Sequence, residues 1–161
     1  MSKRMTWVAV LWAPALLLAT VARADVEASA GWTRATPPGV KVAVGYLTLK
    51  NTGKVKRELL RISSPAAKDI TLHQSSVDAT GVSRMWPVGK LELAPGESLR
   101  FEPNGRHLML EGLGASLVAG KQVSVTLTFD GEKPVTVQLE VRPLVDDAGS
   151  RSGPAGHDAH H

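Results

Sequence analysis

The sequence contains no cysteine among its 161 residues. This absence excludes disulfide bonds, thiolate metal sites, cysteine nucleophiles and blue-copper ligation, as well as lipid attachment to a cysteine at a cleavage site. Hydrophobic residues make up 43% of the chain and charged residues 21%. These proportions exclude a disordered polymer and a membrane protein with many spans, and the length suits one ordinary domain.

Signatures of catalysis and nucleotide binding are also absent. The sequence has no Ser-His-Asp ordering, no paired carboxylates with a pocket signature, no G-x-G-x-x-G motif and no P-loop. The short Gly112-Leu113-Gly114 segment is too small to be a phosphate loop. We therefore do not expect an enzyme.

The excess of positive charge belongs mainly to the first residues of the chain. The net charge is +4, but Lys3, Arg4 and Arg23 lie in a segment that we expect to be removed. The remainder has 16 basic and 15 acidic residues, a net charge of +1. Because nucleic-acid binders keep a basic patch after processing, nucleic acid is not an expected partner.

That first segment has the features of a secretory signal. Met1–Arg4 is positively charged, Met5–Val21 is almost wholly apolar, and Ala22-Arg23-Ala24 offers small residues to a signal peptidase. We expect cleavage before Asp25, at the end of a signal peptide that spans residues 1–24. The alternative is a membrane anchor, for which an apolar run of about 17 residues is marginal. No later segment is apolar enough, so the mature form is expected not to span a membrane.

Ten short runs of strand-forming residues follow, separated by turns rich in Gly, Pro, Asn and Asp. Many short strands with turns at about 8–12-residue spacing are typical of an antiparallel sandwich or barrel, so the predicted fold class is all-β. The predicted strands are Ala28–Ala35, Ala43–Asn51, Glu58–Ser63, Asp69–His73, Ser83–Val88, Lys90–Leu93, Ser98–Phe101, Arg106–Leu110, Gln122–Phe129 and Pro134–Arg142.

Two segments outside these strands have their own predictions. Gly112–Val118 could form a short helical turn. Residues 146–161 are rich in Gly, Ser, Asp and His, have no core-forming pattern and are predicted to be a disordered tail. The folded domain is accordingly expected to span residues 25–145.

Few soft or borderline metal donors remain after processing, and they are of two kinds. The mature chain keeps only Met85 and Met109, and the folded body only His73 and His107. Thioether and imidazole groups suit Cu(I) better than Zn²⁺, Mg²⁺ or Ca²⁺. A thioether cannot form a disulfide, so it can hold soft copper in an oxidising compartment.

Strand alternation predicts which way these four side chains point. In Arg106–Glu111 the leucines share one face, which leaves His107 and Met109 on the other. The same alternation in Ile70–His73 turns His73 away from the core. We therefore expect donors that point outward.

The remaining donor follows the same rule. Met85 has the opposite parity to Trp86, so we expect Trp86 in the core and Met85 outside it. Two ordinary interpretations stay open at this point, namely a gap-filling methionine and a hydrogen-bonded surface histidine.

The spacing of the four donors resembles the pattern H(M)x10Mx21HxM of the periplasmic copper chaperones of the PCu(A)C type. Here His73 and Gln74 precede ten residues, then Met85, twenty-one residues and the segment His107-Leu108-Met109. The resemblance covers about Val26 to Val141, nearly all of the folded body. Flanking segments are also similar to the family: Gly31–Gly39, Gly45–Asn51 and Gly105–Leu110.

The resemblance implies a cupredoxin-like Greek-key β-sandwich, located in the periplasm, that binds Cu(I) at an exposed edge. It also implies transfer to a copper acceptor, either cytochrome c oxidase subunit II with its CuA centre or a Sco-type protein. Gln74 replaces an optional methionine of the pattern, which excludes a fifth soft donor. We expect a monomer. The alternatives are a metal-free secreted interaction module and a copper storage or detoxification protein.

The end of the chain offers a second candidate metal site. His157, His160 and His161 lie close to Asp158, a donor set that suits Cu(II) more than Cu(I). We expect either a second, looser copper site here or a solvated tail with no function.

Overall fold

The computed structural model describes residues 24–144, which form ten β-strands and no helix. The ten predicted strands are confirmed, with differences only at their ends. The observed strands are β1 (Val26–Arg34), β2 (Val42–Asn51), β3 (Arg57–Ser63), β4 (Asp69–Val77), β5 (Ser83–Pro87), β6 (Leu91–Leu93), β7 (Ser98–Arg100), β8 (Arg106–Glu111), β9 (Gln122–Phe129) and β10 (Val135–Arg142).

Alternation of apolar and polar residues explains why these segments form half-buried strands. In β9 the valines, Leu127 and Phe129 are buried, while the serine and threonines between them are only half-buried. In β10 Val137, Leu139 and Val141 are buried between exposed residues. Strands β9 and β10 thus each contribute one apolar face to the common core.

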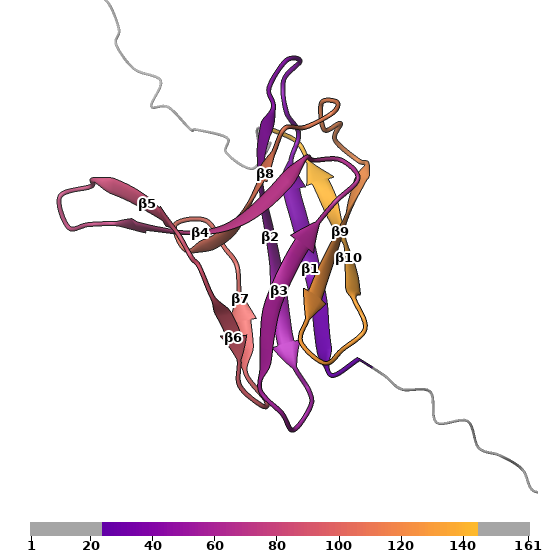
Figure 1. Cartoon of the computed structure of the whole chain (residues 1–161). Helices are drawn as coiled ribbons and strands as arrows, with labels where there is room; N and C mark the ends of the chain where they lie inside the picture. The colour runs from indigo at the N-terminus through magenta and orange to yellow at the C-terminus, as the bar shows by residue number, and fades with distance from the viewer. Residues whose placement is uncertain (1–23, 145–161) are drawn as a thin grey trace, which may run out of the picture.

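The strands are joined into one continuous path of pairing, in the order β5-β4-β8-β2-β1-β10-β9-β3-β6, with β7 alongside β2. All of these neighbours are antiparallel except β1 and β10, which run parallel. The path bends into two facing layers around the core (Figure 1). The predicted cupredoxin-like Greek-key β-sandwich is confirmed.

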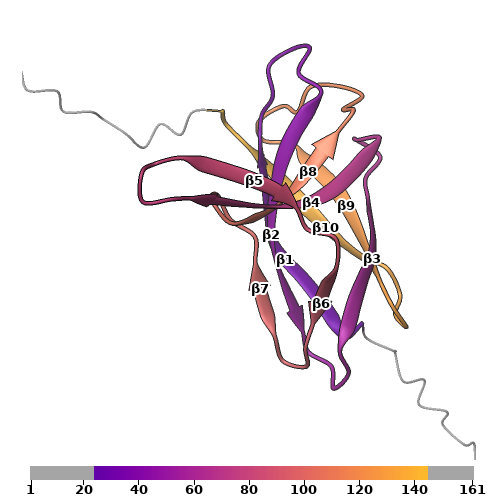
Figure 2. The ribbon, with the colours of Figure 1, turned by 60° about the vertical axis from the view of Figure 1, so that its left-hand side comes forward.

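Strands β4 and β5 form a hairpin that projects from the sandwich as an arm (Figures 1 and 2). We call residues 73–87 the arm; its tip is the turn at Asp78–Val82, where the Asp78 carboxylate accepts hydrogen bonds from the backbone of Thr80 and Val82. All five residues of β5 are exposed, and Trp86 retains 44% of its surface. The expectation of a buried Trp86 is therefore wrong, because β5 lies beyond the reach of the core.

The helical turn expected at Gly112–Val118 is not formed, and this segment is an irregular loop. Leu113 and Leu117 are both buried, so their four-residue spacing imitates a helix although each fills a separate place in the core. Backbone hydrogen bonds from Leu113 to Lys41 and from Leu117 to the hydroxyl of Thr36 fix the loop instead.

The described residues leave out both ends of the chain. The predicted signal peptide, apart from Ala24, and the tail histidines His157, His160 and His161 lie outside them. Between residues 24 and 144 there is no helix that could cross a membrane.

Candidate metal centre

Three neighbouring strands, β5, β4 and β8, position the four predicted donors. His73 on β4 stands directly opposite His107 on β8. In the same ladders Met85 on β5 is opposite Ser75, and Met109 on β8 is opposite Thr71. Because alternate residues share a face, all four side chains lie on the face opposite the buried leucines of β4 and β8. The predicted common face is therefore observed.

Three of the four donors come together. The Nε2 atom of His107 lies 3.3 Å from the sulfur of Met85, and the rings of His73 and His107 are 6.0 Å apart between centroids. Met85 reaches across β4 to make this contact, since β5 and β8 are not neighbours. Met109 lies two residues from His107 on the same face, and within residues 24–144 no hydrogen bond joins its sulfur to the other three donors.

The orientation of the His107 ring is fixed by the backbone. Its Nδ1 atom lies 3.1 Å from the carbonyl oxygen of Gly105, which also accepts a hydrogen bond of 2.9 Å from the amide of Ser75. A carbonyl only accepts, so Nδ1 carries the hydrogen and the neutral ring has its lone pair on Nε2. This arrangement, in which a backbone carbonyl orients the second ring nitrogen, is typical of metal-binding histidines.

The lone pair of Nε2 therefore faces the sulfur of Met85 with no hydrogen between them. Two electron-pair donors at 3.3 Å do not attract one another, and a cation placed beside them would bind to both.

An unsatisfied nitrogen lies next to this pair. The Nδ1 atom of His73 is buried and has no hydrogen-bond partner among the described residues. Buried polar atoms are nearly always satisfied in folded proteins, so an orphan in the middle of a donor cluster indicates a missing ligand. The residues present thus fit a bound metal ion.

Exposure varies strongly across the four donors. His107 is only 5% exposed, His73 and Met109 are half-buried, and Met85 is 51% exposed. His107 lies on the outer face, as expected, but it is buried there, so the expectation of an exposed donor is wrong for this residue. The sulfur of Met85 and the carbonyl of Gly105 lie against its ring.

An aromatic pair lies on β1 and β2, and β2 is the neighbour of β8. Tyr46 on β2 is opposite Trp32 on β1. Tyr46 stacks on Trp32 with 4.3 Å between ring centroids. Burial raises the pKa of Tyr46 above its usual value, and the nearby charge of Arg34 partly offsets this effect.

The charge of the donor set also favours a particular ion. All four donors are neutral when bound to metal, and residues 24–144 contain no cluster of three or more His, Cys, Asp or Glu side chains that could hold a metal. Neutral imidazole and thioether groups leave the charge of a cation uncompensated, which is less costly for a monovalent soft ion such as Cu(I) than for a divalent one.

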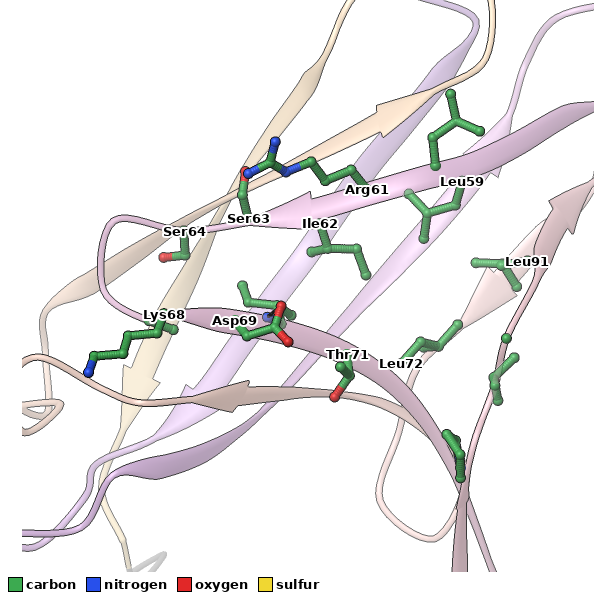
Figure 3. A pocket seen from close by; sticks show the side chains of 16 residues that line it. Leu59, Arg61, Ile62, Ser63, Ser64, Lys68, Asp69, Thr71, Leu72 and Leu91 are labelled. Atoms are coloured by element: carbon green, nitrogen blue, oxygen red, sulfur yellow. Dashed lines mark hydrogen bonds between the residues drawn. The ribbon is translucent and has the colours of Figure 1, made fainter.

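A separate cleft of about 500 Å³ lies between β3 and β4 (Figure 3). Its lining includes Ile62, Ile70, Leu72 and Leu91 together with the polar side chains of Arg61 and Asp69. None of the four donors lines it, so it is not part of the candidate metal centre.

Sequence reasoning missed Gly105 and Ser75, whose backbone groups orient His107. The available signal was the turn Pro103-Asn104-Gly105 immediately before β8, in which Asn104 adopts a positive φ of 61°. This turn places the Gly105 carbonyl next to the ring, but a backbone contact of this kind leaves no side-chain pattern to recognise.

Residues 26–141 match the family described as "LpqE-like: Putative lipoprotein LpqE-like". The chain belongs to this family. Together with the solved structures of PCuAC domains that share the fold of this chain, this match confirms the resemblance to PCu(A)C-type proteins. This sequence has no cysteine, so no residue in it can carry a lipid on a thiol.

Two curated relatives support this assignment. The chain is 34% identical over 134 residues to "Putative lipoprotein Lxx21020" of Leifsonia xyli subsp. xyli, covering 81% of this chain and 76% of that protein. It is 33% identical over 97 residues to "Uncharacterized protein RP573" of Rickettsia prowazekii. That second match covers 60% of this chain and about half, 53%, of the relative.

Solved structures share the fold. The "Copper-bound PCuAC domain from PmoF2" superposes with a TM-score of 0.62 at 20% identity, covering 74% of this chain and 93% of that one. The "Solution structure of CuI-DR1885 from Deinococcus Radiodurans" superposes with a TM-score of 0.55 at 25% identity, covering 71% and 76%.

Proposed function

We propose that this protein is an exported copper chaperone, which binds Cu(I) through His73, Met85, His107 and Met109 and then passes it to an acceptor. Copper is the cargo of the protein and not a resident cofactor. The observation that carries the proposal is the pair formed by His107 Nε2 and the Met85 sulfur at 3.3 Å, next to the unsatisfied nitrogen of His73.

Related proteins support this proposal. The two structural relatives named above are described as copper-bound and as a Cu(I) form, and they have the same fold as this chain. The chain's own spacing of His and Met residues fits the same cargo, since it supplies two imidazoles and two thioethers on one face.

The gradient of exposure suggests how copper would enter and leave. Met85 is exposed on the arm, so an incoming ligand can replace its sulfur without disturbing the core. His107 is buried and held by Gly105, so it would be the last donor to release the ion. Copper would thus be exchanged one ligand at a time and would never be free in solution.

The proposed acceptor and location follow from the family resemblance. The acceptor is cytochrome c oxidase subunit II, at its CuA centre, or a Sco-type protein. The proposed location is the periplasm, after removal of the signal peptide before Asp25.

The direct test is an anaerobic Cu(I) titration against a chromogenic chelator. We expect the affinity to fall by more than about 100-fold in His107→Ala and in Met109→Ala, because loss of even a group that supports a ligand costs 10–100-fold. Circular dichroism of each variant verifies that it is folded. Equal affinities for the wild type and both variants would leave a metal-free interaction module as the better account.

A further inference from the structure

The start of β1 lies near the loops β2–β3 and β9–β10, at the end of the sandwich away from the arm (Figure 1). Three charged side chains meet there. Arg57 Nη2 donates a hydrogen bond of 2.8 Å to the carboxylate of Asp25, and its Nε lies 2.8 Å from a carboxylate oxygen of Glu132. The Glu132 side chain is only 4% exposed, against 15% for Arg57 and 39% for Asp25.

The charges in this cluster do not balance. Two carboxylates face one guanidinium, which leaves one negative charge in excess. The Nε atom of Arg57 makes no properly aligned hydrogen bond to Glu132 despite the short distance. A buried carboxylate that is incompletely neutralised is unfavourable, so a second cationic partner would stabilise Glu132.

The backbone nitrogens at the start of β1 show where that cationic partner would bind. One oxygen of Glu132 accepts a hydrogen bond of 3.2 Å from the backbone nitrogen of Asp25, and the other accepts one of 3.3 Å from Val26. Residue 25 is held in this place, because its carbonyl accepts hydrogen bonds from the amide and hydroxyl of Thr52. A side chain at Gly53 would come within 2.5 Å of the Asp25 side chain and would displace it.

The backbone nitrogen of Asp25 is the atom that cleavage of the predicted signal peptide would release. We propose that Glu132 is the receptor for the α-ammonium group that signal removal creates at Asp25. Hydrolysis breaks the C–N bond between Ala24 and Asp25. Water supplies the hydroxyl group to the carboxyl of Ala24 and a proton to the nitrogen, which takes up another proton from solvent. Arg57 and the new α-ammonium group then face the carboxylates of Asp25 and Glu132, two positive charges against two negative ones.

Removal of the signal peptide therefore supplies the positive charge that Glu132 lacks in the precursor. The precursor presents a neutral amide to Glu132, whereas the mature protein presents a full positive charge to the same oxygen. The mature domain is expected to be more stable than the precursor, and the gain depends on cleavage at this bond. An amine one residue earlier would lie about 3.8 Å further along the chain, beyond hydrogen-bond reach of Glu132.

The test compares two proteins that differ by one residue. One begins at Asp25 and the other at Ala24, each released from a cleavable fusion, so both have an α-amino group and the same net charge. We expect the Asp25 form to melt about 3 °C or more above the Ala24 form at neutral pH. Glu132→Gln should abolish this difference. Equal melting temperatures, or a difference that persists in Glu132→Gln, would overturn the proposal.

The pH dependence gives a second readout. A neighbouring carboxylate raises the pKa of an α-amino group above its ordinary value of about 7.7–8.0. The extra stability of the Asp25 form is therefore fully present below the ordinary pKa and is lost as pH rises through the raised pKa of the folded protein. The other charged groups facing it are Arg57, Asp130 and the carboxylates of Asp25 and Glu132. The melting difference should therefore close at alkaline pH, and a difference that is constant up to pH 10 would contradict the proposal.

Two controls separate this proposal from the copper site. The intact mass of protein recovered after export should correspond to a chain that begins at Asp25, and another first residue would overturn it. The Cu(I) affinity should be the same for wild type and Glu132→Gln, because none of the four donors lies in this cluster. A loss of copper binding in His107→Ala but not in Glu132→Gln would support the proposed function and would say nothing about the receptor role of Glu132.

Discussion

Strands β8 and β5 both contribute donors to the candidate metal centre, but their surroundings are opposite. On β8, Leu108 and Leu110 are fully buried and His107 is 5% exposed. On β5, every residue is exposed, including Met85 at 51%. One donor is thus held by the core of the protein, and another by an arm that has solvent on both faces.

The pairing of the two strands explains this difference. Strand β8 has β4 and β2 as neighbours, whereas β5 pairs only with the outer half of β4. A segment with one neighbour and little buried apolar surface is stabilised weakly, so it opens more easily than the core. A chaperone that must hold and release an ion gains from this division, since the fixed side retains selectivity while the arm allows exchange.

The largest expected effect comes from damaging the buried side. Leu108→Ala removes a fully buried side chain next to His107 and should lower the free energy of unfolding by about 2–5 kcal/mol. Urea denaturation measures this change. A loss below about 1 kcal/mol would show that β8 is not the rigid element described above.

The second prediction concerns the arm. Met85→Leu keeps the volume and hydrophobicity of an exposed side chain but removes the sulfur, so Cu(I) affinity should fall about 10–100-fold while stability changes by less than about 0.5 kcal/mol. Chelator competition and urea denaturation measure the two effects.

Trp86→Leu is the matched control for the arm. Trp86 is the next residue on β5 and points to the opposite face, so its replacement should leave Cu(I) affinity unchanged. If both substitutions weakened binding equally, the arm as a whole would matter and the sulfur of Met85 would have no specific role.

A third prediction tests the burial of Tyr46 on β2, the neighbour of β8; it is the single tyrosine in the chain. Burial raises its pKa, so the folded protein should show tyrosinate absorbance only above pH 10. The pKa of Tyr46 is higher in the folded than in the unfolded chain. The contribution of neutral Tyr46 to stability is therefore fully present below about pH 10 and is lost as pH rises through the pKa of the folded state. Arg34→Gln should move the titration still higher, because the charge of Arg34 lowers this pKa. Titration at the ordinary value would indicate that Tyr46 is open to solvent.

The smallest effect is expected at the bulge in β1. Ala30 has a φ of 51°, in the left-handed region, where the chain shifts register between Ser29 and Trp32. Glycine adopts this conformation without strain, so Ala30→Gly should raise stability by about 0.5 kcal/mol despite its greater backbone entropy. Thermal unfolding measures the gain, and a clear destabilisation would show that Ala30 is not strained. Copper affinity should not change.

The comparison of β8 and β5 also explains what the sequence could predict. Strand-forming runs between turn residues predict all ten strands, and alternation predicts the face shared by the four donors, because β4 and β8 bury their other face. It did not predict that His107 is buried, since alternation identifies the core face but not what covers the outer one.

Hydrophobic alternation does not predict the projecting arm. The prediction ended β4 at His73, whereas the strand continues to Val77 through polar residues that have no core-forming pattern. For the same reason Trp86 was placed in the core, although β5 has no core to face. Hydrophobic periodicity predicts strands that pack, and a hairpin that projects into solvent leaves little trace in it.

X-ray absorption spectroscopy of the Cu(I)-loaded protein tests the central claim most directly, because it identifies the atoms bound to copper. We predict two nitrogen and two sulfur neighbours in the wild type, and two nitrogens with one sulfur in Met85→Leu. A spectrum without sulfur neighbours, or one that Met85→Leu does not change, would contradict a site shared between the core and the arm.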